Sequence, residues 1–210
     1  MFDLTRLIHL SSGADRDGVL NEIRTVTAGA EHALVQPTLP GVRNGGDILV
    51  HLRFDNFDQR ASVAAEFDSV ISSPGIRHID GAEYLGTPHR GAPHSADAVY
   101  RTLLLRIAPG TQDDTVAQFE EDLRLLPRFV PAINAWQLSR VESAVGSVPW
   151  THVFEQEFAS LDGLTGPYLM HPVHWAFVDR WFDPECPEVI VRDRVCHSFC
   201  RCPSPVLSPG

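Results

Sequence analysis

One order of strand and helix patterns occurs twice in this 210-residue chain, and that repetition constrains the fold more than any other feature. In the first half, strand, helix, strand, strand, helix and strand patterns occupy residues 4–12, 15–29, 32–41, 46–55, 57–73 and 76–86. In the second half, the same order occupies residues 98–110, 112–130, 133–143, 150–160, 161–182 and 188–199. The recurrence indicates an internal repeat.

Each half has the β-α-β-β-α-β order of the ferredoxin-like unit. One such unit covers only one face of its sheet with helices, and a second copy in the same chain can cover the bare face. We therefore expect an α+β fold in which two four-stranded antiparallel sheets pack face to face as an intrachain dimeric α+β barrel. The expected boundaries are a first repeat at 1–88, a linker at 89–97, a second repeat at 98–199 and a Cys/Pro/Ser tail at 200–210.

Alternate side chains along two of the predicted strands point to opposite faces of the sheet, which predicts the face that meets the helices. In the strand at 46–55, the apolar face should meet the helices, and the opposite face carries His51 and Arg53. The corresponding face of the strand at 150–160 carries Glu155 and Glu157. These groups either approach one another across the barrel or reach solvent at its rim. A buried pair would fix the register of the two halves more than it would add stability.

Composition limits the partners. The formal net charge of -10 argues against nucleic acid and against anionic membranes, which favours a small molecule or another protein. All 17 basic residues are arginine, so Schiff-base chemistry and a phosphate-loop lysine are excluded. No apolar run approaches the roughly 20 residues that span a bilayer, and the N-terminus lacks a leader pattern. We expect a cytoplasmic protein, and the arginine bias suggests a bacterial source.

The second half concentrates polar rings around a proline. Tyr168, His171 and His174 fall within seven residues, next to Pro172. Proline disfavours helical geometry at the preceding residue and has no N–H to donate, so the helix should break and restart there. The spacing then predicts His171 near a helix cap and His174 facing inward, one turn before Phe177.

The first half lacks these polar groups. At the equivalent positions of its second helix pattern it carries three apolar residues, Ala64, Phe67 and Val70. The aromatic residues that could line a pocket are also concentrated in the second half, which holds all four tryptophans, Trp136, Trp150, Trp175 and Trp181. The asymmetry predicts a single functional pocket, in the second half. The alternative is that the histidines only cap or pack the helix.

Two metal hypotheses were weighed against this pocket. A site formed by His171, His174 and His152 needs a carboxylate or other acceptor, and the sequence places none beside them. The second candidate is the cluster Cys196, His197, Cys200 and Cys202. Zinc sites usually pair ligand knuckles from two separate segments, so we interpret these cysteines as incidental thiols and expect no metal.

The stretch THVFEQEFASLDGLTGPYLMHPVHWAFVDRWFDP, closed by EVIVRDRV, resembles the stress-responsive A/B barrel (Dabb) family, which has a His-Pro-x-His stretch at this point of the domain. The resemblance covers about residues 98–199. The first half is similar only in its element order and in GDILVHLRF. The whole chain thus resembles a fused tandem protein, in which an intrachain pair replaces the usual homodimer.

The resemblance implies residue roles. In olivetolic acid cyclase, a cofactor-free member of that family, a tyrosine and a histidine stand in the same arrangement as Tyr168 and His174, which are therefore the expected catalytic residues. A pocket histidine of that enzyme corresponds to His152. Arg101 stands where the enzyme has another histidine, a departure that argues against the same substrate. The expected substrate-binding residues are His152, His171, Arg101, Phe154, Trp175 and Phe177.

The implied chemistry is acid–base catalysis on a small-molecule substrate, with no metal or organic cofactor. A neutral His174 could remove a proton next to a carbonyl or from a hydroxyl, and Tyr168 could donate a hydrogen bond to the oxygen where charge develops. This predicts a lyase, cyclase or isomerase, and a homodimer of the tandem unit is compatible with it. The alternatives are a non-catalytic, stress-responsive ligand-binding barrel and, from the wider barrel group, a haem-binding protein or a monooxygenase.

Overall fold

The computed structural model describes residues 1–208 and begins with the element order that the sequence predicts. The elements of the first half are β1 (Phe2–Leu10), α1 (Arg16–Val26), β2 (His32–Pro37), β3 (Ile48–Phe54), α2 (Phe57–Ile71) and β4 (Ile76–Leu85). Both helices begin at side-chain caps, since Asp15 accepts a hydrogen bond from the Gly18 N–H at 3.1 Å and Asn56 accepts one from the Gln59 N–H at 2.9 Å.

The second half departs from a regular repeat near its end. Its elements are β5 (His89–Arg90), β6 (Val99–Leu105), α3 (Asp113–Phe129), β7 (Ile133–Val145), β8 (His152–Phe158), α4 (Leu161–Gly163), the π-helical turns η1 (Leu164–Tyr168) and η2 (His174–Val178), the 3-10 turn η3 (Asp179–Trp181) and β9 (Cys196–Arg201). None of the helices within residues 1–208 combines the length and apolar character that crossing a membrane requires.

The strands form a nearly closed antiparallel barrel. Their order is β2-β3-β1-β4-β7-β8-β6-β9, and β5 pairs with β7. The two halves are thus joined edge to edge through β4 and β7, where Gly81 lies opposite Val145. On the other side, bridges from Thr38 to Cys200 and from Arg43 to His197 bring the first half to β9.

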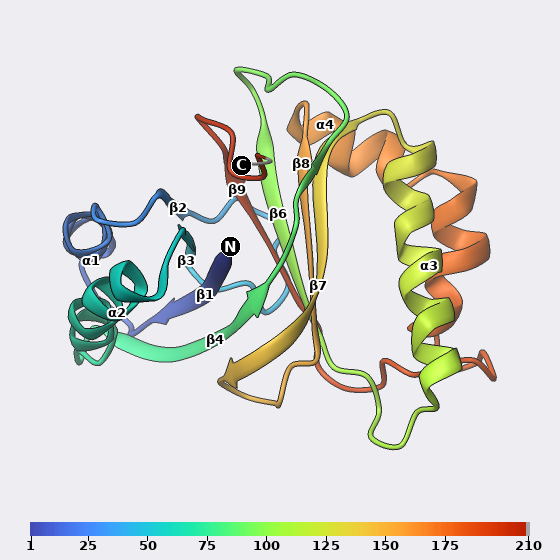
Figure 1. The fold of residues 1–210 in the computed structure, drawn as a ribbon, viewed down its shortest axis with the longest axis horizontal. Coiled ribbons are helices and arrows are strands. Elements are labelled where there is room, and N and C mark those ends of the chain that lie inside the picture. The colour runs from blue at the N-terminus through green and yellow to red at the C-terminus, as the bar shows by residue number, and fades with distance from the viewer. Residues whose placement is uncertain (209–210) are drawn as a thin grey trace.

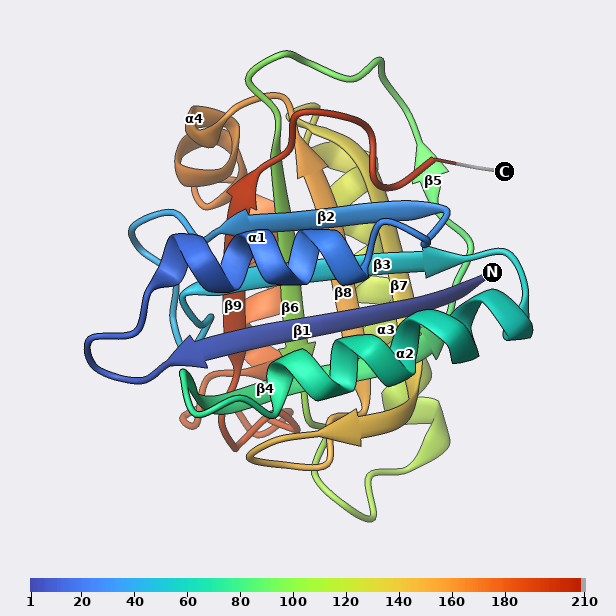
Figure 2. The ribbon, with the colours of Figure 1, turned by 90° about the vertical axis from the view of Figure 1, so that its left-hand side faces the viewer.

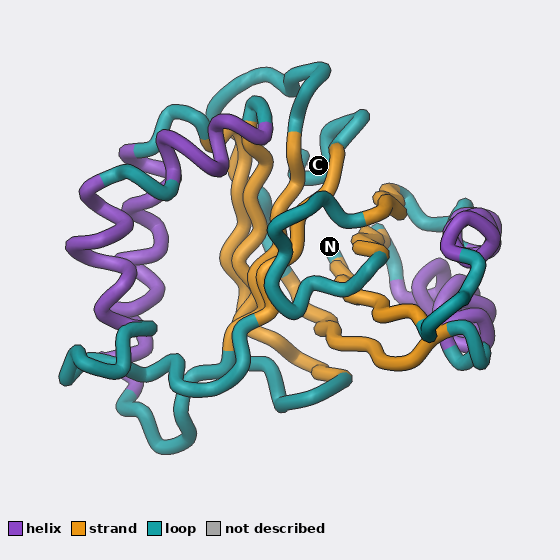
Figure 3. Tube along the Cα trace, turned by 180° about the vertical axis from the view of Figure 1, so that it is seen from behind, coloured by secondary structure: helices purple, strands orange, loops and turns teal. Residues whose placement is uncertain are grey.

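The helices cover the outside of the barrel at two opposite ends. Helices α1 and α2 lie at one end and α3 and α4 at the other, with the strands between them (Figures 1 and 3). Figure 2 shows the strands of the first half running across those of the second half. The predicted α+β barrel is confirmed, although its two halves belong to one continuous sheet rather than to two separate sheets.

The predicted face assignment is also confirmed. Alternate residues of β3 pack with α1 and α2 in one apolar core, which contains Ile48, Val50, Leu52, Phe54, Leu20, Ile23 and Phe67. In the second half, Phe154 and Phe158 pack in a separate core that includes Phe119 and Leu123 of α3. A third core fills the space between the two halves of the sheet and includes Leu7, Leu49, Tyr84, Leu104 and Val153.

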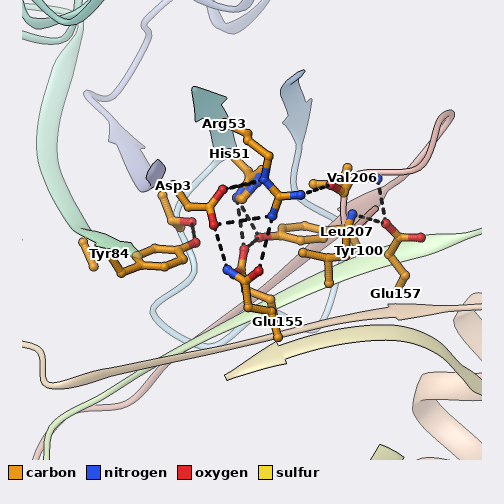
Figure 4. Close-up of polar contacts among 12 residues, drawn as sticks. Asp3, His51, Arg53, Tyr84, Tyr100, Glu155, Glu157, Val206 and Leu207 are labelled. Atoms are coloured by element: carbon orange, nitrogen blue, oxygen red, sulfur yellow. Dashed lines mark hydrogen bonds and ion pairs between the residues drawn. The ribbon is translucent and has the colours of Figure 1, made fainter. Parts of the chain in front are cut away.

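A buried polar network crosses the barrel interior (Figure 4). His51 Nδ1 lies 3.0 Å from Glu155 Oε1, and both side chains are fully buried. Arg53 donates from Nε to Asp3 Oδ1 at 2.7 Å and from a terminal nitrogen to Gln137 at 3.3 Å. The expected approach of His51 to Glu155 is therefore observed inside the barrel. The network ties residues of the first half to residues of the second.

Residues 200–207 pack against the body of the fold. Glu157 meets neither His51 nor Arg53 in an ion pair within residues 1–208, and instead accepts the backbone N–H groups of Val206 and Leu207 at 2.6 Å each and an Arg90 hydrogen bond at 2.6 Å. Val206, Leu207, Cys200 and Cys202 are buried in the core between the sheet halves. The expected division between a second repeat and a tail at residue 200 therefore cuts through β9.

The final strand begins later than the sequence predicts. Residues 188–199 read as one strand, but the ladder with β6 starts at Cys196. The apolar run before it packs under the broken helix instead, where the N–H groups of Ile190 and Val191 both reach the carbonyl of Trp181. A short buried apolar run has no periodicity that distinguishes a strand from an irregular buried segment.

Candidate active site

The helix region of residues 161–181 breaks beside Pro172, as the sequence predicts. The turn η1 ends at Tyr168, and η2 starts at His174. Between them, His171 Nδ1 accepts a hydrogen bond from the backbone N–H of Val173 at 3.2 Å, so His171 serves as a cap. The backbone N–H of His174 donates to the carbonyl of His171 at 2.9 Å, so the second part of the helix region starts from this cap.

A cavity of about 940 Å³ lies between the outer face of the second sheet half and this broken helix. Four of the predicted site residues line it, Arg101 from β6, Phe154 from β8, Tyr168 from η1 and His174 from η2. The segment between the helix and β9 closes another side of it, and Arg43 and Asn44 reach it from the first half. Its volume falls in the range of small-molecule sites.

His174 forms an acid–base pair with Asp179. The two residues lie five apart, and His174 Nδ1 is 3.0 Å from Asp179 Oδ1. Burial lowers the pKa of His174 below 6.5, and the Asp179 carboxylate partly opposes this shift. A carboxylate at Nδ1 favours the tautomer with a proton there, which leaves Nε2 free to accept a proton.

Tyr168 lies against His174 with its hydroxyl protonated. Its ring packs edge-on against the rings of His174 and Phe158, with centroid separations of 5.1 Å and 5.2 Å. Burial raises the pKa of Tyr168 above 10, although Arg101 opposes the shift. The phenol is therefore a hydrogen-bond donor at neutral pH.

Arg101 is a buried cation that hydrogen-bonds to neutral side chains. Only 5% of the residue is exposed, and its guanidinium lies 5.0 Å from the centre of the Tyr168 ring. One nitrogen donates to Gln156, and Nε donates to His197 Nε2 at 2.7 Å. Within residues 1–208, no acidic side chain forms an ion pair with Arg101.

His197 accepts the Arg101 hydrogen bond because it is neutral. Burial, followed by Arg101 and His174, lowers its pKa to about 3. The sequence pattern places His197 in the cysteine cluster and indicates no role for Asp179. Local sequence patterns could have indicated both residues. His197 and Phe199 are two apart and therefore share one face of a strand, and Asp179 follows His174 by about one π-helical turn.

Four other predicted residues lie outside the cavity lining. His152 is held by Glu120 Oε1 at 3.1 Å and by Thr151 Oγ1 at 2.9 Å, deep beside α3. His171 is the cap described above. Trp175 and Phe177 face outward, with 54% and 43% of each residue exposed. The Trp175 indole N–H bonds the carbonyl of Leu169 at 2.9 Å and so spans the helix break.

The cavity residues do not make up a metal-ligand set. Among the described residues, two groups of three could hold a metal ion, and both lie elsewhere. They are His9, His78 and Asp80, and His94, Glu157 and Cys202. The cavity brings together a histidine–aspartate pair, a protonated tyrosine and a buried arginine.

Solved structures with this architecture cover nearly the whole chain. An anthrone oxidase-like protein superposes over 94% of this chain and 89% of its own, with a TM-score of 0.69 and 12% identity. A candidate monooxygenase from Lactobacillus acidophilus covers 94% of this chain and 91% of its own, with a TM-score of 0.57 and 10% identity. One from Fusobacterium nucleatum covers 94% and 90%, with a TM-score of 0.58 and 8% identity. At these identities, the likeness is one of fold.

Sequence comparison adds a family for the second half. No curated protein gave a significant match to the chain. The family model described as the stress responsive A/B barrel domain matches residues 99–196, which run from the start of β6 to the start of β9 and include the cavity residues Arg101, Phe154, Tyr168 and His174. Residues 99–196 of this chain therefore match the stress responsive A/B barrel (Dabb) domain.

Proposed function

We propose that this protein is a cofactor-independent small-molecule enzyme of the cyclase, lyase or isomerase type. The observation that carries the proposal is the position of Arg101, a buried cation that forms no ion pair with any acidic side chain of residues 1–208, at the wall of a cavity that also holds a base and a phenol donor. Burying an unpaired charge is costly. A substrate that brings or develops negative charge next to Arg101 would offset that cost.

The proposed reaction starts with proton transfer. His174 Nε2 takes a proton from the carbon next to a substrate carbonyl, and the electron pair of the broken C–H bond moves onto the carbonyl oxygen. Asp179 stabilises the imidazolium that forms. Tyr168 and Arg101 donate hydrogen bonds to the resulting oxyanion, which is the type of stabilisation that acts most strongly in a site shielded from water. The enolate then cyclises, eliminates or is reprotonated elsewhere.

The remaining predicted residues have supporting roles in this proposal. Phe154 supplies apolar contact to the substrate in the cavity. His152 and His171 hold α3 and the helix break in place through the hydrogen bonds already described. Trp175 and Phe177 cover the outside of the same segment. We further propose that the first half is a degenerate copy of the domain that keeps the scaffold and has lost the polar groups.

The test is deuterium exchange at carbon, because the three reaction types share the proton-abstraction step. Aromatic ketones and β-diketones are incubated with the protein in D₂O, and the loss of the α-proton signal is followed by NMR. We expect exchange with at least one compound class, and His174→Gln should slow it by about 10²- to 10⁴-fold. The matched control is His32→Gln, which changes the same residue type at an exposed position of β2, outside the cavity, and should retain the activity.

The competing hypothesis is a ligand-binding barrel without chemistry, in which Tyr168 and His174 only pack the broken helix. The close packing of the buried Tyr168 ring on Phe158 favours it. It predicts that the double variant Tyr168→Phe/His174→Gln lowers the thermal midpoint while exchange stays at the solvent rate for every variant. Exchange that is equally fast in wild type and in His174→Gln would rule out the catalytic role of His174.

A further inference from the structure

A second cavity, of about 620 Å³, lies where the first half of the barrel meets the segment before β9. His9 of β1 and His78 of β4 line it, together with Arg194 from the second half. Asp80 lies beside the two imidazoles and is completely buried. The proposed reaction uses none of these groups.

The strand register brings the three side chains together. His9 pairs directly with His78, and Leu7 pairs with Asp80 two residues further along. Since directly opposed and alternate residues share a face, His9, His78 and Asp80 all project from the same face of the sheet. The pairing shifts immediately after His9, at a β-bulge. Bulges of this kind re-aim side chains next to functional sites.

Asp80 is oriented by the turn after β7. The backbone N–H and the hydroxyl of Ser147 both donate to Asp80 Oδ1, at 2.8 Å and 2.7 Å. The approach requires Gly146, which has φ +110° and where a Cβ atom would lie 2.3 Å from Oδ1. With Oδ1 held on one side, Oδ2 points between the imidazoles. Outer contacts that fix one carboxylate oxygen are typical of metal ligands.

The three candidate ligand atoms all lie within 4.8 Å of one another. His78 Nε2 is 3.1 Å and His9 Nε2 is 3.9 Å from Asp80 Oδ2. Ligands at metal distances of about 2.0–2.2 Å lie roughly 3–3.5 Å apart in tetrahedral or octahedral geometry. His9 Nε2 is buried and has no hydrogen-bond partner among the described residues. We propose that His9, His78 and Asp80 bind a divalent first-row transition-metal ion.

Two imidazoles and one carboxylate suit Zn²⁺, Co²⁺ or Fe²⁺ better than Mg²⁺, which prefers oxygen ligands. Three protein ligands also leave at least one coordination position free, and the adjoining cavity provides room for water or an exogenous ligand there. The cavity shares Asn44 and Arg194 with the lining of the candidate active site. The metal site would therefore be an open one that borders the proposed pocket.

Arg194 competes with the ion for Asp80. A terminal nitrogen of Arg194 lies 3.6 Å from Oδ2, and the Cys196 thiol donates to the same oxygen at 3.5 Å. Metal binding must displace the guanidinium from Oδ2. Removing its charge should therefore tighten metal binding, which a purely structural Asp80–Arg194 contact would not predict.

The test is calorimetric titration of the full-length chain with ZnCl₂, with MgCl₂ as the comparison, and absorption spectroscopy with CoCl₂. We expect one equivalent of Zn²⁺ to bind, no matching Mg²⁺ binding, and visible Co²⁺ bands. Ser147→Ala should weaken Zn²⁺ binding by about 10- to 100-fold. His9→Gln and His78→Gln should weaken it more, and Arg194→Gln should strengthen it.

Two control substitutions remove histidines that lie outside the proposed metal site. His32→Gln removes an exposed histidine from β2 and should leave the titration unchanged. His94→Gln tests the other candidate ligand group and should also leave it unchanged. His78 is 34% exposed in its side chain, so His78→Gln should fold, as the thermal midpoint will show. Absence of Zn²⁺ binding, or binding that survives His9→Gln and His78→Gln, would overturn the proposal.

Discussion

At the scale of single residues, the position of Arg101 is poorly explained by packing alone. A buried guanidinium normally pairs with a carboxylate, and the interior of this barrel shows that pattern in the contact of Arg53 with Asp3 at 2.7 Å. Arg101 instead has an amide, a neutral imidazole and an aromatic ring around it. These contacts use Nε and one terminal nitrogen as donors and leave the charge of Arg101 available to a ligand.

Arg101→Gln should therefore separate stability from function. Glutamine keeps a donor for Gln156 and removes the uncompensated charge, so the free energy of unfolding should stay level or rise. Exchange activity should fall by about 10²- to 10³-fold, as for the loss of one oxyanion donor. Urea unfolding and the NMR exchange assay measure the two quantities. A large loss of stability with activity retained would mean that Arg101 is a structural residue.

At the scale of elements, the π-helical turn η2 determines which side chains meet. Widening one turn brings residue i+5 under residue i, which is how Asp179 reaches His174. The corresponding helix of the first half, α2, is regular through its fifteen residues. The same place in the two halves is thus an unbroken scaffold helix in one and a broken, site-forming segment in the other.

Asp179→Asn should change both the rate and its pH dependence. The carboxylate raises the pKa of His174 against burial, so removing it should lower that pKa further. His174 must be neutral to act as a base. The acid limb of the kcat/KM profile, expected below pH 6.5, should therefore move to lower pH. Loss of a fully buried orienting carboxylate costs about 10⁴-fold in kcat, and the half-exposed Asp179 should cost less. An acid limb that stays at the same pH in the variant would show that Asp179 does not influence the pKa of His174.

The sequence predicted elements whose pattern is local and missed contacts that depend on long-range geometry. The break at Pro172 and the inward side of β3 follow from rules that act within a few residues. Asp179 required a π-helical turn, and the His9–His78–Asp80 group required the register of two distant strands. The late start of β9 depends on the packing of residues 189–191 under Trp181.

At the scale of the whole molecule, the buried network between the sheet halves couples stability to pH. Burial would raise the pKa of Glu155, but His51 and hydrogen bonds from Tyr100 and Tyr84 outweigh burial and hold it below 4.5. The folded state therefore binds fewer protons at this carboxyl than the unfolded state in acid. The corresponding stability is present above about pH 4.5 and is lost as pH falls through the folded-state pKa.

Glu155→Gln should reduce this acid sensitivity. The substitution removes the nearer of the two carboxylates that contact His51, since Glu155 lies at 3.0 Å and Asp3 at 3.8 Å, so the unfolding free energy at pH 7 should fall, by about 3–5 kcal/mol at most. Between pH 5 and pH 3 the variant should lose less additional stability than the wild type. Urea unfolding across this pH range measures both effects. Parallel pH profiles for the two proteins would show that Glu155 does not control the acid transition.

The bridge between Arg43 and His197 has a consequence for how this molecule can change over time. It hydrogen-bonds a strand-end loop of the first half to the strand that carries a cavity residue of the second. In an assembly of two identical chains, every substitution would appear on both sides of the barrel. In this chain a substitution changes only one half of the barrel, so the first half can be altered by selection while the cavity residues of the second half stay the same. The first half can therefore change as a scaffold while the second half keeps the residues that line the cavity.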